Sequence, residues 1–285
     1  MNSGFQHLQI PDPVFGGTVP AIAQYPTSQQ AAGVTVGPFT WEATFNAPLA
    51  PGRFPVCVIS HGAGGSHLLY RELGTHLARA GWIVVCAEAP RDNRNDNSLS
   101  YSDESVTHRC RHLTATLDAL LAHPQLGAGA DPARIALVGH SLGGCAALAL
   151  VGGQPWSRKR SPIPVQPDPR FRAAVLMAPA TGFYRGPGAL AKVAGKLLVL
   201  AGEKDDVTPA EDIRHDLQGL PSSVACEFVV IKGAGHYSFL SPFPEALRQP
   251  DFPPAQDPAG FDRAQFHREL PGIVESFLAK ALPRP

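Results

Sequence analysis

The chain changes from one pattern to another along Ile135-Ala136-Leu137-Val138-Gly139-His140-Ser141-Leu142-Gly143-Gly144. The first part is an apolar run of strand length, and the last part opens a helical run of small residues. A serine between two glycines at such a junction predicts a sharp strand-to-helix turn that exposes the hydroxyl and leaves the next backbone N–H free. We therefore predict Ser141 as a nucleophile. In the alternative interpretation, Gly139 and Gly143 only permit a tight turn, and Ser141 caps the helix.

Around this segment, short apolar runs alternate with helical spacings. Further strands are predicted at 55–60, 83–87, 173–177, 197–201 and 227–231, and helices at 69–77, 106–120 and 266–277. Pro271 is expected to kink the last helix or to mark its start. Near-continuous apolar strands separated by helices predict a mostly parallel α/β sheet covered on both faces. Turn-rich runs at 19–25 and 39–45 predict antiparallel strands that lead into this sheet.

Composition narrows the class of protein. The 285 residues, 44% of them apolar, are enough for one domain, which we expect to span 1–285. The 24 basic residues balance 24 acidic ones and form no long stripe, so we expect no nucleic-acid partner. No apolar run reaches the roughly 18 residues of a membrane span, and the first nine residues do not resemble a signal peptide. We therefore expect a cytoplasmic protein; its oligomeric state is left open.

The five cysteines are expected to be free thiols. None of them forms a Cys-x-x-Cys pair, and three lie in apolar strand-like runs, where cysteine behaves as a small hydrophobic residue. The five are Cys57, Cys86, Cys110, Cys145 and Cys226.

A serine nucleophile needs a base and an acid that orients the base. His236 follows a late strand through a glycine-rich turn, and we predict it as the base. Asp205 follows the strand at 197–201 and is the predicted acid, whereas the adjacent Asp206 is expected to be solvated or to cap the next helix. The order serine, aspartate, histidine is the order of α/β-hydrolases and differs from that of chymotrypsin-like and subtilisin-like enzymes.

The reaction also needs donors for the oxyanion that forms on the substrate. The run His61-Gly62-Ala63-Gly64-Gly65 directly follows the predicted strand at 55–60. Glycines allow the backbone to approach a reacting carbonyl closely. We predict the backbone N–H groups of Ala63 and Leu142 as the oxyanion hole. The alternative is a flexible turn without a catalytic role.

Together these motifs resemble the serine hydrolases of the α/β-hydrolase fold. Most similar is the branch that contains dienelactone-hydrolase-like and platelet-activating-factor-acetylhydrolase-like proteins. The resemblance rests on Phe54-Pro55-Val56-Cys57-Val58-Ile59-Ser60-His61-Gly62, on Asp131-Pro132-Ala133-Arg134-Ile135, and on Gly233-Ala234-Gly235-His236-Tyr237-Ser238-Phe239-Leu240. The acetylhydrolase-like branch implies a serine that acts on short or oxidised acyl esters. Dienelactone hydrolases use a cysteine where this chain has Ser141.

Three polar or proline-rich segments follow a strand or the helix after Ser141, and we regard 91–103, 154–170 and 238–262 as possible lids. Candidate residues for a substrate pocket are His61, Gly62, Phe183, Tyr184, Tyr237 and Phe239. The alternative is that the segments are ordinary connecting loops and the aromatic residues are core residues.

The sequence does not favour a metal site or a nucleotide-binding site. His108 and His112 stand four residues apart on one predicted helix face, but no His-Glu-x-x-His pattern accompanies them, and we expect a solvated face and no metal. The glycine runs lack the third glycine of a dinucleotide fingerprint and the serine or threonine of a phosphate loop, so no cofactor is predicted.

The predicted function is hydrolysis of carboxylic esters through an acyl-enzyme, with small esters of short-chain or aryl type as substrates. Two alternatives stay open at this point. The same three residues also serve acyltransferases and peptidases. A binding protein on the same scaffold is the remaining possibility.

Overall fold

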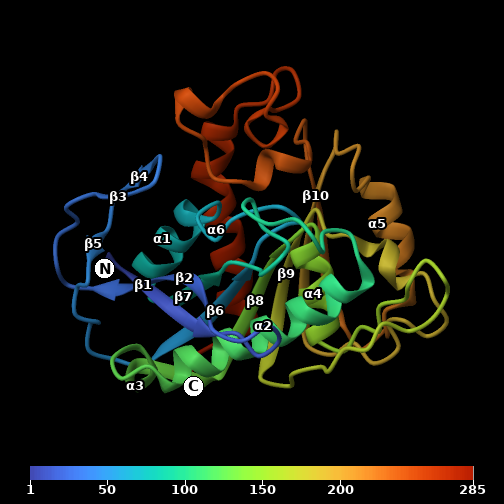
Figure 1. Ribbon diagram of the computed structural model, residues 1–285, viewed down its shortest axis with the longest axis horizontal. Helices are drawn as coiled ribbons and strands as arrows, with labels where there is room; N and C mark the ends of the chain where they lie inside the picture. Colours follow the sequence, from blue (N-terminus) through green and yellow to red (C-terminus); the bar gives the residue numbers. More distant parts are fainter. Residues whose placement is uncertain (285) are drawn as a thin grey trace.

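The computed structural model describes residues 1–284. A nine-stranded sheet runs through its centre in the order β11-β10-β9-β8-β6-β7-β2-β1-β5 (Figure 1). The strands are β1 (Asn2–Pro11), β2 (Thr18–Thr27), β5 (Thr44–Phe45), β6 (Phe54–Ser60), β7 (Ile83–Ala87), β8 (Ala130–His140), β9 (Phe171–Met177), β10 (Lys196–Gly202) and β11 (Ala225–Ile231). The six strands from β11 to β7 are parallel to one another, which confirms the predicted strands and the predicted parallel core.

Helices cover both faces of the sheet. One face packs against α2 (Asp103–Ala122), α4 (Leu142–Leu150) and α5 (Ala210–Asp216), the other against α1 (Arg71–Arg79) and α6 (Arg263–Ala281), and α3 (Leu126–Gly129) follows α2. Successive strand residues point to opposite faces. In β6, Val56 and Val58 face α2 and α4, whereas Cys57 and Ile59 face α1 and α6. Both faces are buried, and this explains why the central strands are apolar at nearly every position.

The N-terminal region forms the antiparallel part of the sheet. β2 pairs antiparallel with β7, and β1 pairs antiparallel with β2 over its whole length. The prediction for 39–45 is right in one respect and wrong in two. β4 (Phe39–Trp41) is an antiparallel strand, but it pairs with β3 (Val34–Val36) in a separate two-stranded sheet, and β5 adds to β1 in parallel. Trp41 packs edge-on against Phe5 of β1 with ring centroids 5.1 Å apart, so this run is held by aromatic packing as well as by strand pairing.

Two smaller expectations have different outcomes. Pro271 lies inside α6, eight residues after its first residue Arg263, and therefore does not mark its start. All five cysteines are free, as predicted, and four of them are buried.

The turn between β8 and α4 depends on two glycines. A Cβ atom on Gly143 would lie 2.2 Å from the carbonyl oxygen of Ser60 in β6, and one on Gly139 would lie 2.2 Å from the carbonyl oxygen of Gly143. Such distances are far inside van der Waals contact, and the atoms involved are backbone atoms that have no room to shift. Both glycines are thus required by close packing of the helix on the sheet.

We expect Gly143→Ala to lower the melting temperature strongly because the added methyl group collides with the backbone of β6. Gly272→Ala is the matched control, since Gly272 lies in the interior of α6 with open space around its Cα. This control should gain about 0.5–1 kcal/mol of stability from helix propensity. Thermal unfolding of both variants tests the pair, and an unchanged melting temperature for Gly143→Ala would contradict the steric argument.

Candidate active site

Ser141 occupies the turn at the carboxyl end of β8. Its backbone has φ 55° and ψ −119°, a left-handed region that non-glycine residues rarely adopt. The backbone N–H of Ser141 donates to the carbonyl of Met177 at the end of β9 (3.0 Å), which holds the strained turn against the neighbouring strand. Ser141 stands at the N-cap position of α4, but its side chain makes no capping hydrogen bond there. Its hydroxyl is free for another partner.

That partner is His236. The Nε2 atom of His236 lies 3.0 Å from Ser141 Oγ, and its Nδ1 atom lies 2.8 Å from Asp205 Oδ2. His236 begins the short helical turn η3 (His236–Phe239) after β11, and Asp205 follows β10. The structure therefore brings together the three residues predicted from three separate loops, at the hydrogen-bond distances that proton transfer from a serine requires.

The carboxylate of Asp205 is held in its charged form. Burial disfavours the charge, but hydrogen bonds with His236 and Thr208 lower the pKa of Asp205 below its usual value. Its Oδ1 accepts the backbone N–H groups of Val207 (2.9 Å) and Thr208 (2.8 Å). The adjacent Asp206 is exposed and does not cap α5, whose N-cap is Pro209. The geometry thus favours Asp205 over Asp206 as the acid, and of the two expected roles for Asp206 only solvation fits.

Asp205→Asn and Asp206→Asn form a matched pair for this assignment. We expect Asp205→Asn to lower kcat by about 10⁴-fold, because the amide would favour the wrong tautomer of His236. Asp206→Asn should leave kcat within about twofold of wild type, as expected of a solvated side chain. Steady-state kinetics on both variants provide the test, and equal losses would contradict the choice of Asp205.

The predicted oxyanion donors lie beside Ser141. We call residues 61–65 the oxyanion loop. It follows β6, and the last residue of β6, Ser60, stands opposite Gly139 of β8. Leu142 is the first residue of α4, so its N–H has no acceptor within that helix. Ala63 lines the same cavity as Ser141. Among residues 1–284, the backbone N–H groups of Ala63 and Leu142 donate to no backbone carbonyl of a turn or loop.

Ser141 opens into a cavity of about 410 Å³ with a mostly apolar wall, which we call the Ser141 cavity. Two of the predicted pocket residues, Gly62 and Tyr237, line it. Sequence analysis missed most of its wall, which includes Phe39, Leu69, Tyr70, Tyr101, Val207, Leu240, Phe243, Leu247, Phe252 and Pro254. These residues come from loops and from the β3–β4 hairpin, and no local pattern links them to Ser141.

The other four predicted pocket residues do not line the Ser141 cavity. His61 is fully buried, with Nε2 accepting the N–H of Ala89 (2.9 Å). Tyr184 is buried against α4, and its hydroxyl donates to the carbonyl of Cys145 in that helix (2.6 Å). Phe183, beside it in η1 (Thr181–Tyr184), packs against the core on the same side of the sheet. Phe239 points into the core between the sheet and α6 and is only 1% exposed.

Two of the three possible lids contribute to the cavity. Segment 91–103 supplies Arg94, Asn95 and Tyr101, and segment 238–262 supplies much of the apolar wall. The latter lies at the top of Figure 1 in orange and red, with η4 (Glu245–Leu247) and η5 (Pro253–Ala255). Segment 154–170 supplies no lining residue. It packs beside η1, where the backbone N–H of Trp156 donates to the carbonyl of Phe183 (2.6 Å).

The helix face that carries His108 and His112 is not solvated as expected. His112 is buried and its Nε2 lies 2.9 Å from Asp12 Oδ1, while Phe15 packs against both histidine rings. The turn between β1 and β2 thus covers this part of α2. Among residues 1–284 there is no cluster of three potential metal-ligating side chains. None of the helices in that range is both long and apolar enough to span a bilayer.

Three buried histidines near the site are neutral. Burial lowers the pKa of His61 and of His140 to about 3, and that of His267 to about 4; the nearby charge of Arg109 also lowers the pKa of His61. Each ring makes a structural hydrogen bond. His140 Nε2 donates to the carbonyl of His236 (2.9 Å), and His267 Nε2 donates to the carbonyl of Ser238 (3.0 Å).

These histidines make stability depend on pH. Below about pH 6.5 the unfolded chain binds protons at these positions and the folded chain does not, so the free energy of unfolding falls as the pH drops from about 6.5 toward 4. Each group contributes a slope of at most about 1.4 kcal/mol per pH unit. We expect His267→Gln to flatten this slope in urea unfolding, whereas His215→Gln, at an exposed position, should not. Equal slopes in all three proteins would contradict the assignment.

The fold and this site together define a protein of the α/β-hydrolase class, with Ser141, Asp205 and His236 following one another along the chain in the order of that class. The solved structure of ferulic acid esterase from Streptomyces cinnamoneus matches this fold with a TM-score of 0.75 at 20% sequence identity. The match covers 100% of this chain and 91% of that one. The predicted fold class is thereby confirmed.

Sequence comparisons point to esterase families within this fold. A family model described as Chlorophyllase matches residues 39–165. Platelet-activating factor acetylhydrolase from Bos taurus is 23% identical over 253 residues, covering 73% of this chain and 53% of the relative. Cutinase 2 from Thermobifida cellulosilytica is 23% identical over 198 residues, covering 68% of this chain and 65% of the relative. This chain therefore spans between about half and two thirds of the length of these relatives. It belongs to the α/β-hydrolase fold and is similar to their esterase families.

Proposed function

We propose that the protein hydrolyses carboxylic esters through an acyl-enzyme on Ser141. The observation that carries the proposal is the 3.0 Å contact between Ser141 Oγ and His236 Nε2, on a strained turn that opens into a cavity. A binding protein would have no need for a serine held in this costly conformation next to a histidine that is oriented by a buried carboxylate. Similarity to an acetylhydrolase and a cutinase supports the same activity.

The residues suggest a two-step reaction. His236 Nε2 takes the proton of Ser141 as its oxygen attacks the ester carbonyl, and Asp205 stabilises the imidazolium that results. The N–H groups of Ala63 and Leu142 stabilise the negative oxygen of the tetrahedral intermediate. His236 then gives its proton to the leaving alkoxide. In the second step His236 activates a water molecule, which releases the acid and restores the serine.

The cavity favours esters with apolar groups. Aromatic and aliphatic side chains form most of its wall, and Phe243 stacks edge-on with both Phe39 and Phe252. Its volume of about 410 Å³ lies near the lower end of the range of small-molecule sites, about 300–1,000 Å³. We therefore propose short-chain acyl esters or aryl esters as substrates. A long-chain acyl group would extend beyond the enclosed volume.

A series of p-nitrophenyl esters tests this function. We expect hydrolysis of the acetate and butyrate, a lower kcat/KM for the palmitate, and loss of at least about 10³-fold in kcat for Ser141→Ala with the fold preserved. A fluorophosphonate should label wild type and not Ser141→Ala. A variant that keeps more than about a tenth of the wild-type activity would contradict the role of Ser141.

Adding an alcohol to the same assay distinguishes hydrolysis from acyl transfer. Hydrolysis predicts the free acid as the main product, whereas a transferase would give mainly the new ester, because both reactions share the acyl-enzyme and differ in the nucleophile that attacks it. A matched p-nitroanilide tests the peptidase alternative, and faster cleavage of that amide than of the ester would contradict the proposal. Absence of both labelling and turnover in wild type would instead favour a binding protein.

A further inference from the structure

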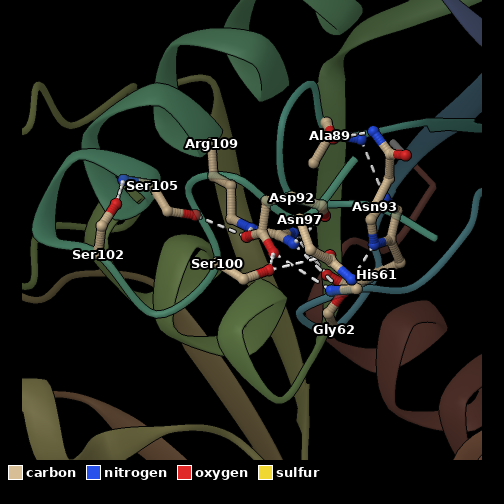
Figure 2. A network of polar contacts seen from close by, with 11 residues as sticks. His61, Gly62, Ala89, Asp92, Asn93, Asn97, Ser100, Ser102, Ser105 and Arg109 are labelled. Carbon is tan, nitrogen blue, oxygen red and sulfur yellow. Dashed lines mark hydrogen bonds and ion pairs between the residues drawn. The ribbon is translucent and has the colours of Figure 1, made fainter. Parts of the chain in front are cut away.

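A buried arginine on α2 holds the backbone of the oxyanion loop. The side chain of Arg109 is only 2% exposed. Its Nη1 donates to the carbonyl of His61 (2.6 Å), and its Nη2 donates to the carbonyl of Gly62 (3.2 Å). Figure 2 shows Arg109 reaching from the helix toward the segment that carries His61 and Gly62. One guanidinium thus binds two consecutive carbonyls of a loop that the proposed mechanism uses.

Asp92 fixes the position of this guanidinium. The Nε of Arg109 donates to Asp92 Oδ2 (2.7 Å), and the hydroxyl of Ser105 donates to the same oxygen (2.6 Å). The other carboxylate oxygen, Oδ1, accepts the hydroxyl of Ser100 and the backbone N–H of Gly64 (3.2 Å). Asp92 therefore binds both the arginine and the oxyanion loop itself, and it connects segment 91–103 to that loop.

The carbonyl of Gly62 receives two more donors. The N–H of Gly65 donates to it (3.1 Å). The Nδ1 atom of His61 lies 2.7 Å from it, and because His61 Nε2 accepts the N–H of Ala89, the ring proton of this neutral histidine must sit on Nδ1. With Arg109, this makes three donors on one carbonyl oxygen.

These donors determine where the N–H of Ala63 points. In a planar trans peptide, the carbonyl of one residue and the N–H of the next point in opposite directions, and the described chain has no cis peptide bond. The Gly62 carbonyl is directed toward Arg109, His61 and Gly65. The N–H of Ala63 is therefore directed away from them, and Ala63 lies on the wall of the Ser141 cavity.

We infer that Arg109, oriented by Asp92, is a positioning residue for the oxyanion hole. It fixes the plane of the Gly62–Ala63 peptide so that the Ala63 N–H is aimed at the developing oxyanion before substrate binds. A cation on the carbonyl also polarises this peptide and strengthens its N–H as a donor. The role needs the planar, forked guanidinium, since a lysine ammonium cannot bind both carbonyls and the carboxylate in the same geometry. The inference rests on the proposed function.

The chain offers a matched control for the ion pair alone. Arg134 at the amino end of β8 also pairs through Nε with a carboxylate, that of Asp131 (2.7 Å), and also donates through Nη2 to a backbone carbonyl, that of Arg53 (3.3 Å). This pair lies at the opposite end of β8 from Ser141. Loss of the Arg134 pair affects stability without touching the oxyanion loop.

We propose to compare Arg109→Lys with Arg134→Lys in three measurements: the melting temperature, kcat and KM for p-nitrophenyl butyrate, and the affinity for a trifluoromethyl ketone. The ketone forms a tetrahedral adduct with a serine and places its oxyanion in the hole. We expect Arg109→Lys to lower kcat by about 10²-fold or more and to weaken the ketone by a similar factor, with KM changed by less than about threefold. Arg134→Lys should leave kcat, KM and the ketone affinity near their wild-type values, whatever its effect on the melting temperature.

If Arg109→Lys does not fold, Asp92→Asn, which keeps the side-chain volume, takes its place in the comparison with Arg134→Lys. It should lower kcat and ketone affinity together, because the guanidinium loses its charged anchor and a single amide oxygen cannot accept from both Arg109 Nε and the Gly64 N–H, which bind different oxygens of Asp92. The inference is overturned if the folded variants of Arg109 and Asp92 keep wild-type kcat and ketone affinity and lose only thermal stability. Wild type that hydrolyses no ester would contradict the proposed function, which is a separate outcome.

Discussion

The arrangement of the site depends on one tight steric constraint, the approach of α4 to the end of β6. Because Gly139 and Gly143 lack side chains, the helix can begin directly against the strand, and Ser141 is forced into a left-handed backbone conformation. The hydrogen bond from its N–H to Met177 holds that conformation. The strained turn lifts the serine hydroxyl out of the sheet. The first N–H of the helix has no acceptor inside the helix, as at the start of any α-helix.

The order of the strands brings the remaining groups to the same place. β6 lies between β8 and β7, so the loops that follow β6 and β8 leave the same edge of the sheet side by side. The loops after β10 and β11 leave from that edge as well, because all these strands are parallel. Asp205 and His236 are thereby carried to Ser141 although they lie more than sixty residues further along the chain. The carboxyl edge of a parallel sheet is where such sites form.

Behind the apolar cavity lies a second layer of buried polar groups. His61, His140 and His267 stay neutral and use their ring N–H groups to hold backbone carbonyls around the site. Arg109 also donates to backbone carbonyls, and Asp92, which neutralises its charge, accepts a backbone N–H. Buried polar groups are costly unless every member has a partner. Three of these groups, His61, Arg109 and Asp92, bind the oxyanion loop directly, which supports a role in the geometry of that loop beyond general stability.

The sequence by itself determined the parallel strands, the helices beside them and the three central residues of the site, but it gave no sign of β1 (Asn2–Pro11). Apolar strands, helical spacing and glycine-rich turns are local patterns, and the order of Ser141, Asp205 and His236 follows from where those turns fall. The N-terminal run at 39–45 was misassigned because Phe39 and Trp41 are held by contacts with distant aromatic rings.

The tertiary structure alone decided the wall of the cavity and the role of His61. It also determined the burial of the helix face that carries Arg109 and His112. These properties depend on which loop packs on which element. A charged or aromatic residue looks the same in sequence whether a neighbouring loop covers it or solvent surrounds it.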